Sequence, residues 1–491
     1  MSGAAQAFAM IDLRPVGYII GLVTAVLGAA MLVPAAADFI DGDANWRALL
    51  SSAIVTMLAG GLVSLACLNG AGAPLRTQHA FVLTTFVWVT LPVFGALPFI
   101  LGVPGVGFTD AFFEAMSGVT TTGTTVFTGL DDMPRGALLW RSILQWIGGL
   151  GIIIVAMLFL PVMKVGGMQF FRSEAFDTMG KVTPRALDLG RALVEVYVLI
   201  TIACTAAYYA LGLSPFDAIN HAFTTVATAG FSTSDESFAR FSGAPEYAAV
   251  LFMILAGFPF VRFVQLAGGR FAPLWRDIQV RAYLRWTGYA IASVLAYRVI
   301  VDGVPLREGV RETAFNVVSL FSGTGYTSAD VSLWGAFPMV VVIVGGVIGA
   351  STASTGCAIK VFRFLVLFEA IKAQIRRIQS PNRVIPVRLE GRPLGEDVIN
   401  SVITLFTLFM FSFGVVAVLL SLAGLENRTA VTAAWTAIFN IGPVFGAEVG
   451  PTGAVDAFPT AAKWIMTIAM LLGRLELLAV LVLLLPRFWR G

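Results

Sequence analysis

The chain has 491 residues, of which 57% are hydrophobic and only 12% are charged, and its mean hydropathy is +0.85. Soluble domains carry about twice that share of charged residues, so the composition excludes an ordinary soluble protein and predicts a polytopic membrane protein. The net charge of +3 is too small to indicate a nucleic-acid partner.

The cysteines and histidines give no sign of a metal or redox centre. Cys67, Cys204 and Cys357 lie far apart, in or beside apolar segments, without the spacing of a disulfide framework or a thiolate site. The sequence contains only His79 and His221, and we expect His221 to be a packing residue. No organic cofactor is expected in this chain.

Two apolar segments come first, over residues 16–37 and 48–68. An acidic turn that contains Asp38, Asp41 and Asp43 joins them. Each segment is long enough to cross the ~30 Å of hydrocarbon in a bilayer. Residues 1–72 are therefore predicted to form an N-terminal transmembrane hairpin.

Eight further apolar segments follow, in four pairs. They cover residues 79–101, 138–162, 189–211, 247–266, 283–301, 337–368, 398–422 and 461–485. The sequence thus predicts an all-α membrane protein with ten transmembrane helices. After the hairpin come four units, each with a first span, a pore loop and a second span in pseudo-fourfold arrangement. The units cover residues 73–165, 166–270, 271–392 and 393–491.

Each unit carries a glycine in a similar setting between its two spans. The glycines are Gly123, Gly230, Gly325 and Gly442, separated by 107, 95 and 117 residues. Thirteen residues earlier stand residues suited to a helix start, namely Asp110, Asp217, Glu312 and Thr429. Six residues earlier stand small hydroxyl residues, namely Ser117, Thr224, Ser319 and Thr436. A short helix is predicted to end just before each glycine.

Four such helices aimed at one axis would have a chemical use. The carbonyls at a helix C-terminus carry partial negative charge, and glycine allows the backbone unusual dihedral angles. A ring of carbonyl oxygens can replace the hydration shell of a cation, which predicts a cation pore. The candidate filter residues are Thr121, Thr122, Gly123, Thr228, Ala229, Gly230, Gly323, Thr324, Gly325, Asn440, Ile441 and Gly442. The alternative is close helix packing through small residues.

Basic residues gather in three loops. They are Lys164, Arg172, Lys181, Arg185 and Arg191 in the first, Arg270, Arg276, Arg281 and Arg285 in the second, and Arg363, Lys372, Arg376, Arg377, Arg383, Arg388 and Arg392 in the third. The positive-inside rule places these loops and both termini in the cytoplasm. The pore loops then open to the outside.

The outer side carries the acidic residues Asp131, Asp132, Asp235, Glu236, Asp330 and Glu448. They would raise the local cation concentration, or they would merely cap and solubilise the loops.

The second span of the third unit is long and interrupted by small residues. Such a run breaks a helix inside the membrane, either as a static kink or as a mobile element. Lys360 is expected to mark the inner end of its helix and to extend its amine to the interface. Arg474 lies deep in an apolar run, where a charge is costly and usually functional. A structural pair with Glu476 or with a carbonyl is the alternative for Arg474.

These segments resemble the TrkH/TrkG potassium-uptake proteins of the Trk/Ktr/HKT superfamily. The four glycine segments, the N-terminal hairpin, residues 256–260, residues 353–363 and residues 473–476 carry the resemblance. It implies K⁺ as the transported ion and a bacterial inner-membrane location among membrane lipids. It also implies a homodimer with one pore per subunit and a cytosolic ring of TrkA-like RCK/KTN nucleotide-binding subunits.

The resemblance further implies a gate beneath the filter. The interrupted stretch would be an intramembrane gate loop, held by Arg474 at the pore axis. Its residues are Gly345, Gly346, Gly349, Ser351, Thr352, Ser354, Gly356 and Lys360. Ala353, Cys357 and Ala358 stand where the family has glycine.

The ion itself is the remaining question. In the plant relatives, serine at the first filter glycine accompanies sodium selectivity, so glycine at all four positions favours K⁺. A Na⁺-permeable or poorly selective member of the superfamily is the alternative. A polytopic membrane enzyme is more remote, because it would need a cluster of His, Asp or Glu at the membrane face.

Overall fold

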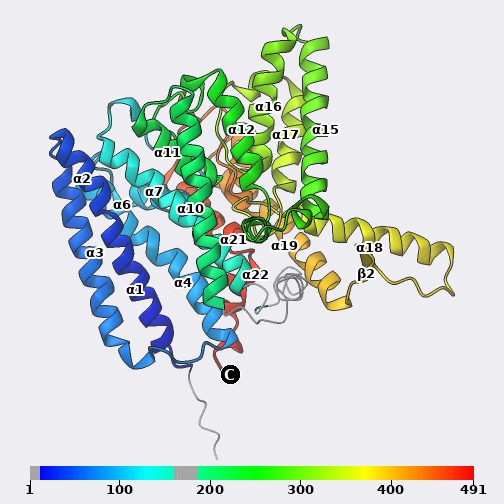
Figure 1. Cartoon of the computed structure of the whole chain (residues 1–491), viewed down its shortest axis with the longest axis horizontal. Helices are drawn as coiled ribbons and strands as arrows, with labels where there is room; N and C mark the ends of the chain where they lie inside the picture. The colour runs from blue at the N-terminus through cyan, green and yellow to red at the C-terminus, as the bar shows by residue number, and fades with distance from the viewer. Residues whose placement is uncertain (1–10, 160–162, 164–185, 491) are drawn as a thin grey trace, which may run out of the picture.

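The computed structural model describes residues 11–159, 163 and 186–490, and these residues are predominantly helical (Figure 1). Among them, the only strands form a two-residue antiparallel hairpin of β1 (Arg388–Leu389) and β2 (Arg392–Pro393). The predicted helical class is therefore confirmed, with this small hairpin as the one departure.

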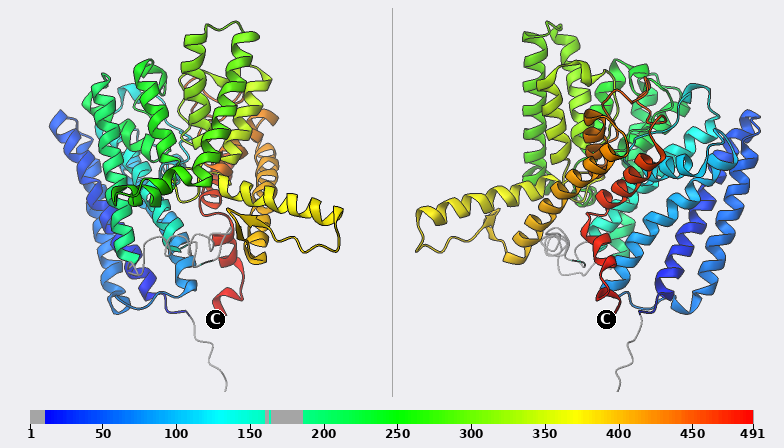
Figure 2. Two further views of the ribbon diagram at one scale, coloured as in Figure 1. Left: turned by 45° about the vertical axis from the view of Figure 1, so that its right-hand side comes forward. Right: turned by 180° about the vertical axis from the view of Figure 1, so that it is seen from behind.

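The N-terminal helices pack along one side of the molecule (Figures 1 and 2). They are α1 (Arg14–Ala30), α2 (Leu32–Asp41) and α3 (Trp46–Ala66). Glycines let α1 and α3 approach closely, because a Cβ built on Gly60 would lie 2.4 Å from the Ala25 nitrogen. Helix α1 also packs on α4 (Thr77–Gly95), and α2 packs on α7 (Arg135–Ile154). The N-terminal helices thus pack against α4 and α7 of the first unit.

Four short helices occupy the predicted positions before the glycines. They are α6 (Phe108–Val119), α11 (Pro215–Val226), α16 (Leu306–Ser322) and α20 (Asn427–Phe439). Three begin near the predicted residue, but α16 begins at Leu306. The expectation that Glu312 starts that helix is wrong, because Glu312 lies inside it and pairs with Arg298 at 2.9 Å.

Each short helix is held by its own unit and by the preceding one. The first helices of the units are α4, α10 (Ala186–Ala210), α15 (Ile278–Ile300) and α19 (Glu396–Leu422). Each packs on the short helix of its own unit. The second helices pack in the pairs α7 on α11, α12 (Ala244–Ala256) on α16, α17 (Ala336–Ile348) on α20, and α21 (Thr460–Arg474) on α6. The last pair closes the circuit, with Lys463 of α21 bonded to Asp110 of α6 at 2.7 Å.

The second helices of three units are broken. Helix α12 meets α13 (Phe260–Ala267) at 94°, and α21 meets the segment Leu478–Leu484, which begins with α22 (Leu478–Leu481), at 101°. Residues 349–360 separate α17 from α18 (Val361–Gln379), which projects from the body (Figure 2). Helix α7 instead continues into a π-helical turn, Val155–Phe159. The predicted break in the third unit is therefore confirmed.

The remaining elements are short connectors. They are α5 (Leu97–Leu101), α14 (Ala272–Arg276) and the 3₁₀ turns Leu68–Gly70, Leu130–Asp132, Ala239–Phe241, Val331–Leu333, Val482–Leu484 and Phe488–Arg490.

Within the described ranges, six helices are long and apolar enough to cross a membrane, or up to eight if each of two bent pairs forms one span. A multi-pass membrane protein is therefore confirmed, whereas the count of ten is not. The core lies around the short helices, where Phe113, Trp140 and Trp435 are almost completely buried.

Asp38 joins the hairpin to the first unit and gives a test of this packing. It accepts hydrogen bonds from the Gly136 amide and the Asn45 carboxamide, while Asn45 accepts one from the Val103 amide. Replacing Asp38 with Ala leaves the Gly136 amide and the Asn45 carboxamide without their acceptor. We expect a loss of about 1–3 kcal/mol per unpaired group, measured as a lower Tm of the purified protein in detergent.

Asp41 is the matched control. Its exposed ion pair with Arg135, at 3.3 Å, also reaches α7 but contributes at most about 1 kcal/mol. Equal shifts in Tm for Asp38→Ala and Asp41→Ala would contradict the role given to Asp38.

Candidate functional site

All four short helices end in the same backbone turn. The residue before each glycine donates its N–H to the backbone carbonyl of the small hydroxyl residue that stands two or three positions before the helix end. The bonds run from Thr122 to Ser117 (2.9 Å), Ala229 to Thr224 (2.9 Å), Thr324 to Ser319 (2.9 Å) and Ile441 to Thr436 (3.2 Å). The residue two positions before each glycine has positive φ, with values of 54° at Thr121, 49° at Thr228, 82° at Gly323 and 51° at Asn440. The left-handed residue and the bond that spans it are those of a Schellman cap.

Two of these caps are strained. Glycine or asparagine normally occupies the left-handed position of a Schellman cap, as Gly323 and Asn440 do. Thr121 and Thr228 are β-branched, and such residues rarely adopt positive φ. Conformations of this kind cost about 1–3 kcal/mol each and persist where the surroundings enforce them, often at functional sites.

The four glycines meet in a closed ring of backbone contacts. Their φ values are 87° at Gly123, 80° at Gly230, 81° at Gly325 and 112° at Gly442. A Cβ built on each would collide with the carbonyl oxygen before the glycine of another unit. The distances are 2.1 Å from Gly123 to Ala229, 2.0 Å from Gly230 to Thr324, 2.1 Å from Gly325 to Ile441 and 2.9 Å from Gly442 to Thr122. The structure therefore brings the four predicted filter segments together at one centre.

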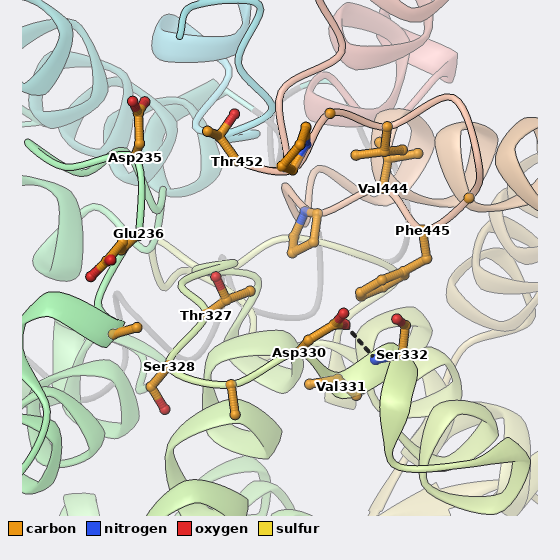
Figure 3. Close-up of a pocket in the computed structure, with 18 residues that line it drawn as sticks. Asp235, Glu236, Thr327, Ser328, Asp330, Val331, Ser332, Val444, Phe445 and Thr452 are labelled. Atoms are coloured by element: carbon orange, nitrogen blue, oxygen red, sulfur yellow. Dashed lines mark hydrogen bonds between the residues drawn. The ribbon is translucent and has the colours of Figure 1, made fainter. Parts of the chain in front are cut away.

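Two cavities adjoin the ring. A small one of about 80 Å³ is lined by all four glycines. A larger one of about 530 Å³ lies beside it, between the segments that follow the second, third and fourth glycines (Figure 3). The two cavities share lining residues, namely Asp235, Thr327, Pro443, Thr452 and Gly453. The larger cavity is thus a vestibule next to the ring.

Three of the acidic residues predicted on the outer side cap backbone amides. Asp330 accepts the Ser332 amide at 2.8 Å (Figure 3), and Asp235 accepts the Gly129 amide at 2.9 Å. Glu448 accepts the Glu426 amide at the start of α20, and a hydrogen bond from Thr429 lowers its pKa. Capping is therefore observed, while Asp235, Glu236 and Asp330 also line the vestibule.

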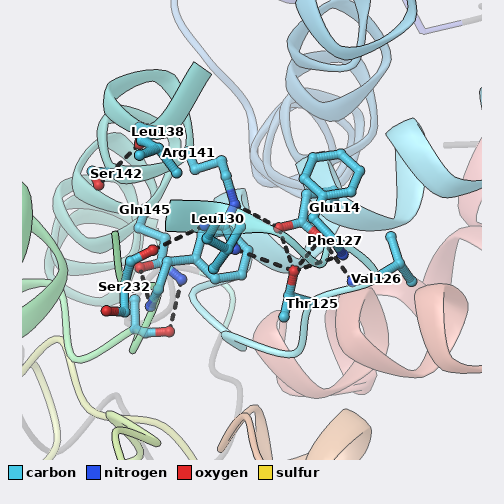
Figure 4. A network of polar contacts seen from close by, with 12 residues as sticks. Glu114, Thr125, Val126, Phe127, Leu130, Leu138, Arg141, Ser142, Gln145 and Ser232 are labelled. Atoms are coloured by element: carbon cyan, nitrogen blue, oxygen red, sulfur yellow. Dashed lines mark hydrogen bonds and ion pairs between the residues drawn. The ribbon is translucent and has the colours of Figure 1, made fainter. Parts of the chain in front are cut away.

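A buried polar network lies behind the ring (Figure 4). Arg141 of α7 and Glu114 of α6 form an ion pair of 2.8 Å and are at most 1% exposed. The Thr125 hydroxyl accepts from Arg141 and donates to Glu114, and Glu114 also accepts the Val126 amide at 3.0 Å. Arg141 reaches the second unit by donating to the Ser232 carbonyl at 3.0 Å. The network thus ties the segments after the first two glycines together.

Sequence reasoning missed Glu114, Arg141 and Gln145. A signal was present, because polar and charged residues inside apolar helices are costly and usually have a role. Arg141 and Gln145 are also four residues apart, which places them on one face of a helix.

Residues 349–360 lie directly against the ring. Ala358 donates its N–H to the Phe439 carbonyl at the end of α20, at 3.2 Å. Cys357 Sγ lies 3.7 Å from Thr121 Oγ1, and a Cβ on Gly323 would lie 3.2 Å from Cys357 Cβ. Ala353 and Ala358 have φ of 60° and 67°, so alanine stands where glycine would be unstrained.

Further bonds fix the buried segment 349–360 to its neighbours. They run from the Ser351 amide to the Gly257 carbonyl (3.0 Å), from the Thr352 amide to Gln279 Oε1 (2.9 Å) and from the Thr355 hydroxyl to the Ala256 carbonyl (3.1 Å). Ser354 and Gly356 lie within the same buried stretch, whereas Gly345 and Gly346 lie in α17 and pack on Phe321 and Trp435.

Arg474 attaches the end of α21 to this segment. Its guanidinium is buried, with Nη1 2.7 Å from Cys357 Sγ and 3.4 Å from the Thr355 carbonyl oxygen. Glu476 pairs with Arg363 at 2.5 Å. Of the two structural partners considered for Arg474, a carbonyl contact is therefore present. Glu476, the other candidate, pairs with Arg363 instead.

Two expectations about basic residues are wrong. Lys360 is only 4% exposed, because it ends the buried segment before α18 and does not extend to an interface. Arg363 was expected in a cytoplasmic basic loop, but it is completely buried in the first turn of α18. Lys164, Arg172, Lys181 and Arg185 lie outside the described residues.

The expectation for His221 is confirmed. Its side chain is fully buried, with Nδ1 2.8 Å from the Asp217 carbonyl oxygen and Nε2 3.1 Å from Ser232 Oγ.

Comparison with known proteins gives one consistent result. The family model of the TrkH cation transport proteins matches residues 47–490. The chain is 37% identical over 479 residues to the Trk system potassium uptake protein TrkI of Halomonas elongata, covering 97% of each chain. It is 32% identical over 484 residues to TrkH of Escherichia coli K12, covering 97% of this chain and 99% of that one.

A solved structure is similar over the same extent. The crystal structure of the potassium transporter TrkH from Vibrio parahaemolyticus superimposes with a TM-score of 0.89 at 30% identity, covering 98% of this chain and all of that one.

The network behind the ring can be tested by removing Arg141. The variant Arg141→Met leaves Glu114 as an unpaired buried carboxylate, which costs about 3–5 kcal/mol. We expect a markedly lower Tm, and the double variant with Glu114→Gln should recover part of it. If the decreases in Tm of the two single variants simply add in the double variant, the two side chains do not form a direct pair. Arg135→Met, which removes an exposed ion pair, is the control.

Proposed function

Because this chain belongs to the TrkH family of cation transport proteins, we propose that it takes up K⁺ through the ring of glycine turns. As a member of this family, it is an ion transporter and not an enzyme. One observation supports the ring as the ion path: each of the four glycines abuts the carbonyl of another unit, and the contacts close around one centre.

The filter would be made of backbone oxygens. In our proposal the carbonyls of the two residues before each glycine hold the ion, in place of its hydration shell. These residues are Thr121, Thr122, Thr228, Ala229, Gly323, Thr324, Asn440 and Ile441. The four short helices end at the ring, so their partial negative charge adds to the attraction for a cation. The relatives named as potassium uptake proteins support K⁺ as the ion.

The membrane potential would drive the ion inward, supplying about 2.3 kcal/mol per charge for each 100 mV. We propose ten crossings with the four units in pseudo-fourfold arrangement and both termini in the cytoplasm. A bacterial inner membrane is the proposed location. The packing of each second helix on the next short helix supports this arrangement.

The gate would be the segment 349–360 together with Gly345 and Gly346, which lie in the last turn of α17. It lies against the ring and is held by Arg474, so it would obstruct permeation until moved. We propose that a cytosolic ring of TrkA-like nucleotide-binding subunits moves it, and that the protein is a homodimer. The names of the relatives, Trk system potassium uptake proteins, support a multi-component transporter.

A less selective filter is the second candidate, and the unevenness of the ring favours it. A Cβ built on Gly442 would lie 2.9 Å from the neighbouring carbonyl oxygen, whereas the same distance is 2.0–2.1 Å at the other three glycines. Asn440 and Pro443 have no counterpart in the other segments. Measured K⁺ and Na⁺ permeabilities decide between the two candidates.

Gly123→Ser tests the filter. A side chain at this position would collide with the Ala229 carbonyl and displace a proposed ligand, so we expect a lower ratio of K⁺ to Na⁺ uptake in liposomes. Gly129→Ser is the control, because Gly129 also has positive φ but no atom within 4 Å of the added Cβ. An unchanged ratio in Gly123→Ser would remove the filter assignment.

Arg474→Leu tests the gate. Loss of the guanidinium removes the bonds to Cys357 and Thr355, so the segment is held less firmly. We expect several-fold faster Rb⁺ flux in liposomes that lack any cytosolic partner. Arg135→Met, which removes only an exposed ion pair with Asp41, should leave the flux unchanged. Flux in Arg474→Leu no faster than in the unmodified protein would argue against this gate.

A further inference from the structure

Gln145 bridges the second filter segment on both sides of its glycine. The carboxamide Nε2 donates to the Ala229 carbonyl at 2.7 Å, and Oε1 accepts the Phe231 amide at 3.0 Å. A backbone N–H can only donate, so the Phe231 bond fixes which end of the carboxamide faces Ala229. Gln145 itself is fully buried in α7.

Helix α7 also contacts residues 229–232 through a second side chain. Arg141, one turn earlier, donates to the Ser232 carbonyl at 3.0 Å and stacks its guanidinium 4.2 Å from the Phe231 ring. The ion pair with Glu114 fixes Arg141 in turn. Residues 229–232 are therefore held against α7 by two side chains that cannot easily reorient.

The hydrogen bond from Gln145 restrains the Ala229 carbonyl, one of the four carbonyls that precede the ring glycines. Over the residues that the structure describes, the Ala229 oxygen receives a side-chain hydrogen bond, whereas the corresponding oxygens of Thr122, Thr324 and Ile441 receive none. A carbonyl oxygen has two lone pairs. The Ala229 oxygen thus keeps one lone pair for a cation while the other is directed to Gln145.

We propose that Gln145 is a specificity-determining positioning residue, which anchors the Ala229 carbonyl so that the ring cannot contract around a smaller ion. The inference rests on the proposed function of the ring as a cation filter. Na⁺ needs its oxygen ligands closer than K⁺ does. A carbonyl that is hydrogen-bonded to a rigid helix cannot move inward to the shorter distance that Na⁺ requires. Na⁺ would therefore lose part of its coordination in the ring. Gln145 acts through Ala229 and does not touch the ion.

Gln145→Met tests the anchor, because methionine keeps the length of the side chain and removes both hydrogen bonds. In the full-length protein reconstituted in liposomes, we expect the ratio of K⁺ to Na⁺ uptake to fall by about two- to tenfold, the effect of one hydrogen bond on an equilibrium. The fall should come from faster Na⁺ uptake, a result that mere loss of folded protein does not produce.

Gln145→Asn provides a second route if the methionine variant folds poorly. It keeps a buried carboxamide, but its stem is shorter by one bond of about 1.5 Å, so it cannot hold both Ala229 and Phe231. We expect the same direction of change. Asn220→Leu is the matched control, since Asn220 is a buried amide of α11 that bonds to the Phe216 carbonyl at 2.8 Å.

The outcomes separate this inference from the filter itself. If both Gln145 variants keep the original ratio while Gly123→Ser lowers it, the filter stands and the role of Gln145 is wrong. If Gly123→Ser also leaves the ratio unchanged, the filter assignment fails and the role of Gln145 fails with it. If Asn220→Leu lowers the ratio as much as Gln145→Met, the effect is general loosening and the inference is overturned.

Discussion

Four backbone contacts, each between a glycine and the carbonyl of another unit, occupy the centre of this protein. No side chain fits there, because a Cβ on Gly230 would lie 2.0 Å from the Thr324 oxygen. The contacts form only if four segments, far apart in sequence, arrive together with their backbones in the left-handed conformation. The short helices, their Schellman caps and the packing of each second helix on the next short helix all meet this requirement.

Polar groups in a hydrocarbon environment need internal partners, and here those partners join the units. Arg141 and Glu114 lie behind the first two segments, and Lys463 and Asp110 connect the last unit to the first. Residues 349–360 also lie against the ring, and Arg474 bonds to this segment. The same bonds that satisfy buried groups therefore fix the geometry of the proposed filter.

The sequence predicted the helical class, the four glycine turns and the break in the third unit, because glycine and apolar length leave strong local patterns. It could not show the strained caps at Thr121 and Thr228, since positive φ at a β-branched residue is imposed by tertiary contacts. Lys360 was misplaced because hydropathy alone does not reveal that a lysine before a helix is buried. Gln145 was missed since one amide in an apolar span shows its role only when its partners are known.

The most direct test of the account is to locate the ion. Crystals grown with Rb⁺ or Tl⁺ in place of K⁺ would give anomalous density wherever the ion binds. We expect a peak on the axis of the ring, within coordination distance of the oxygens of Thr122, Ala229, Thr324 and Ile441. A well-ordered ring without a peak at saturating ion, or a peak away from this axis, would contradict the claim that these carbonyls form the ion path.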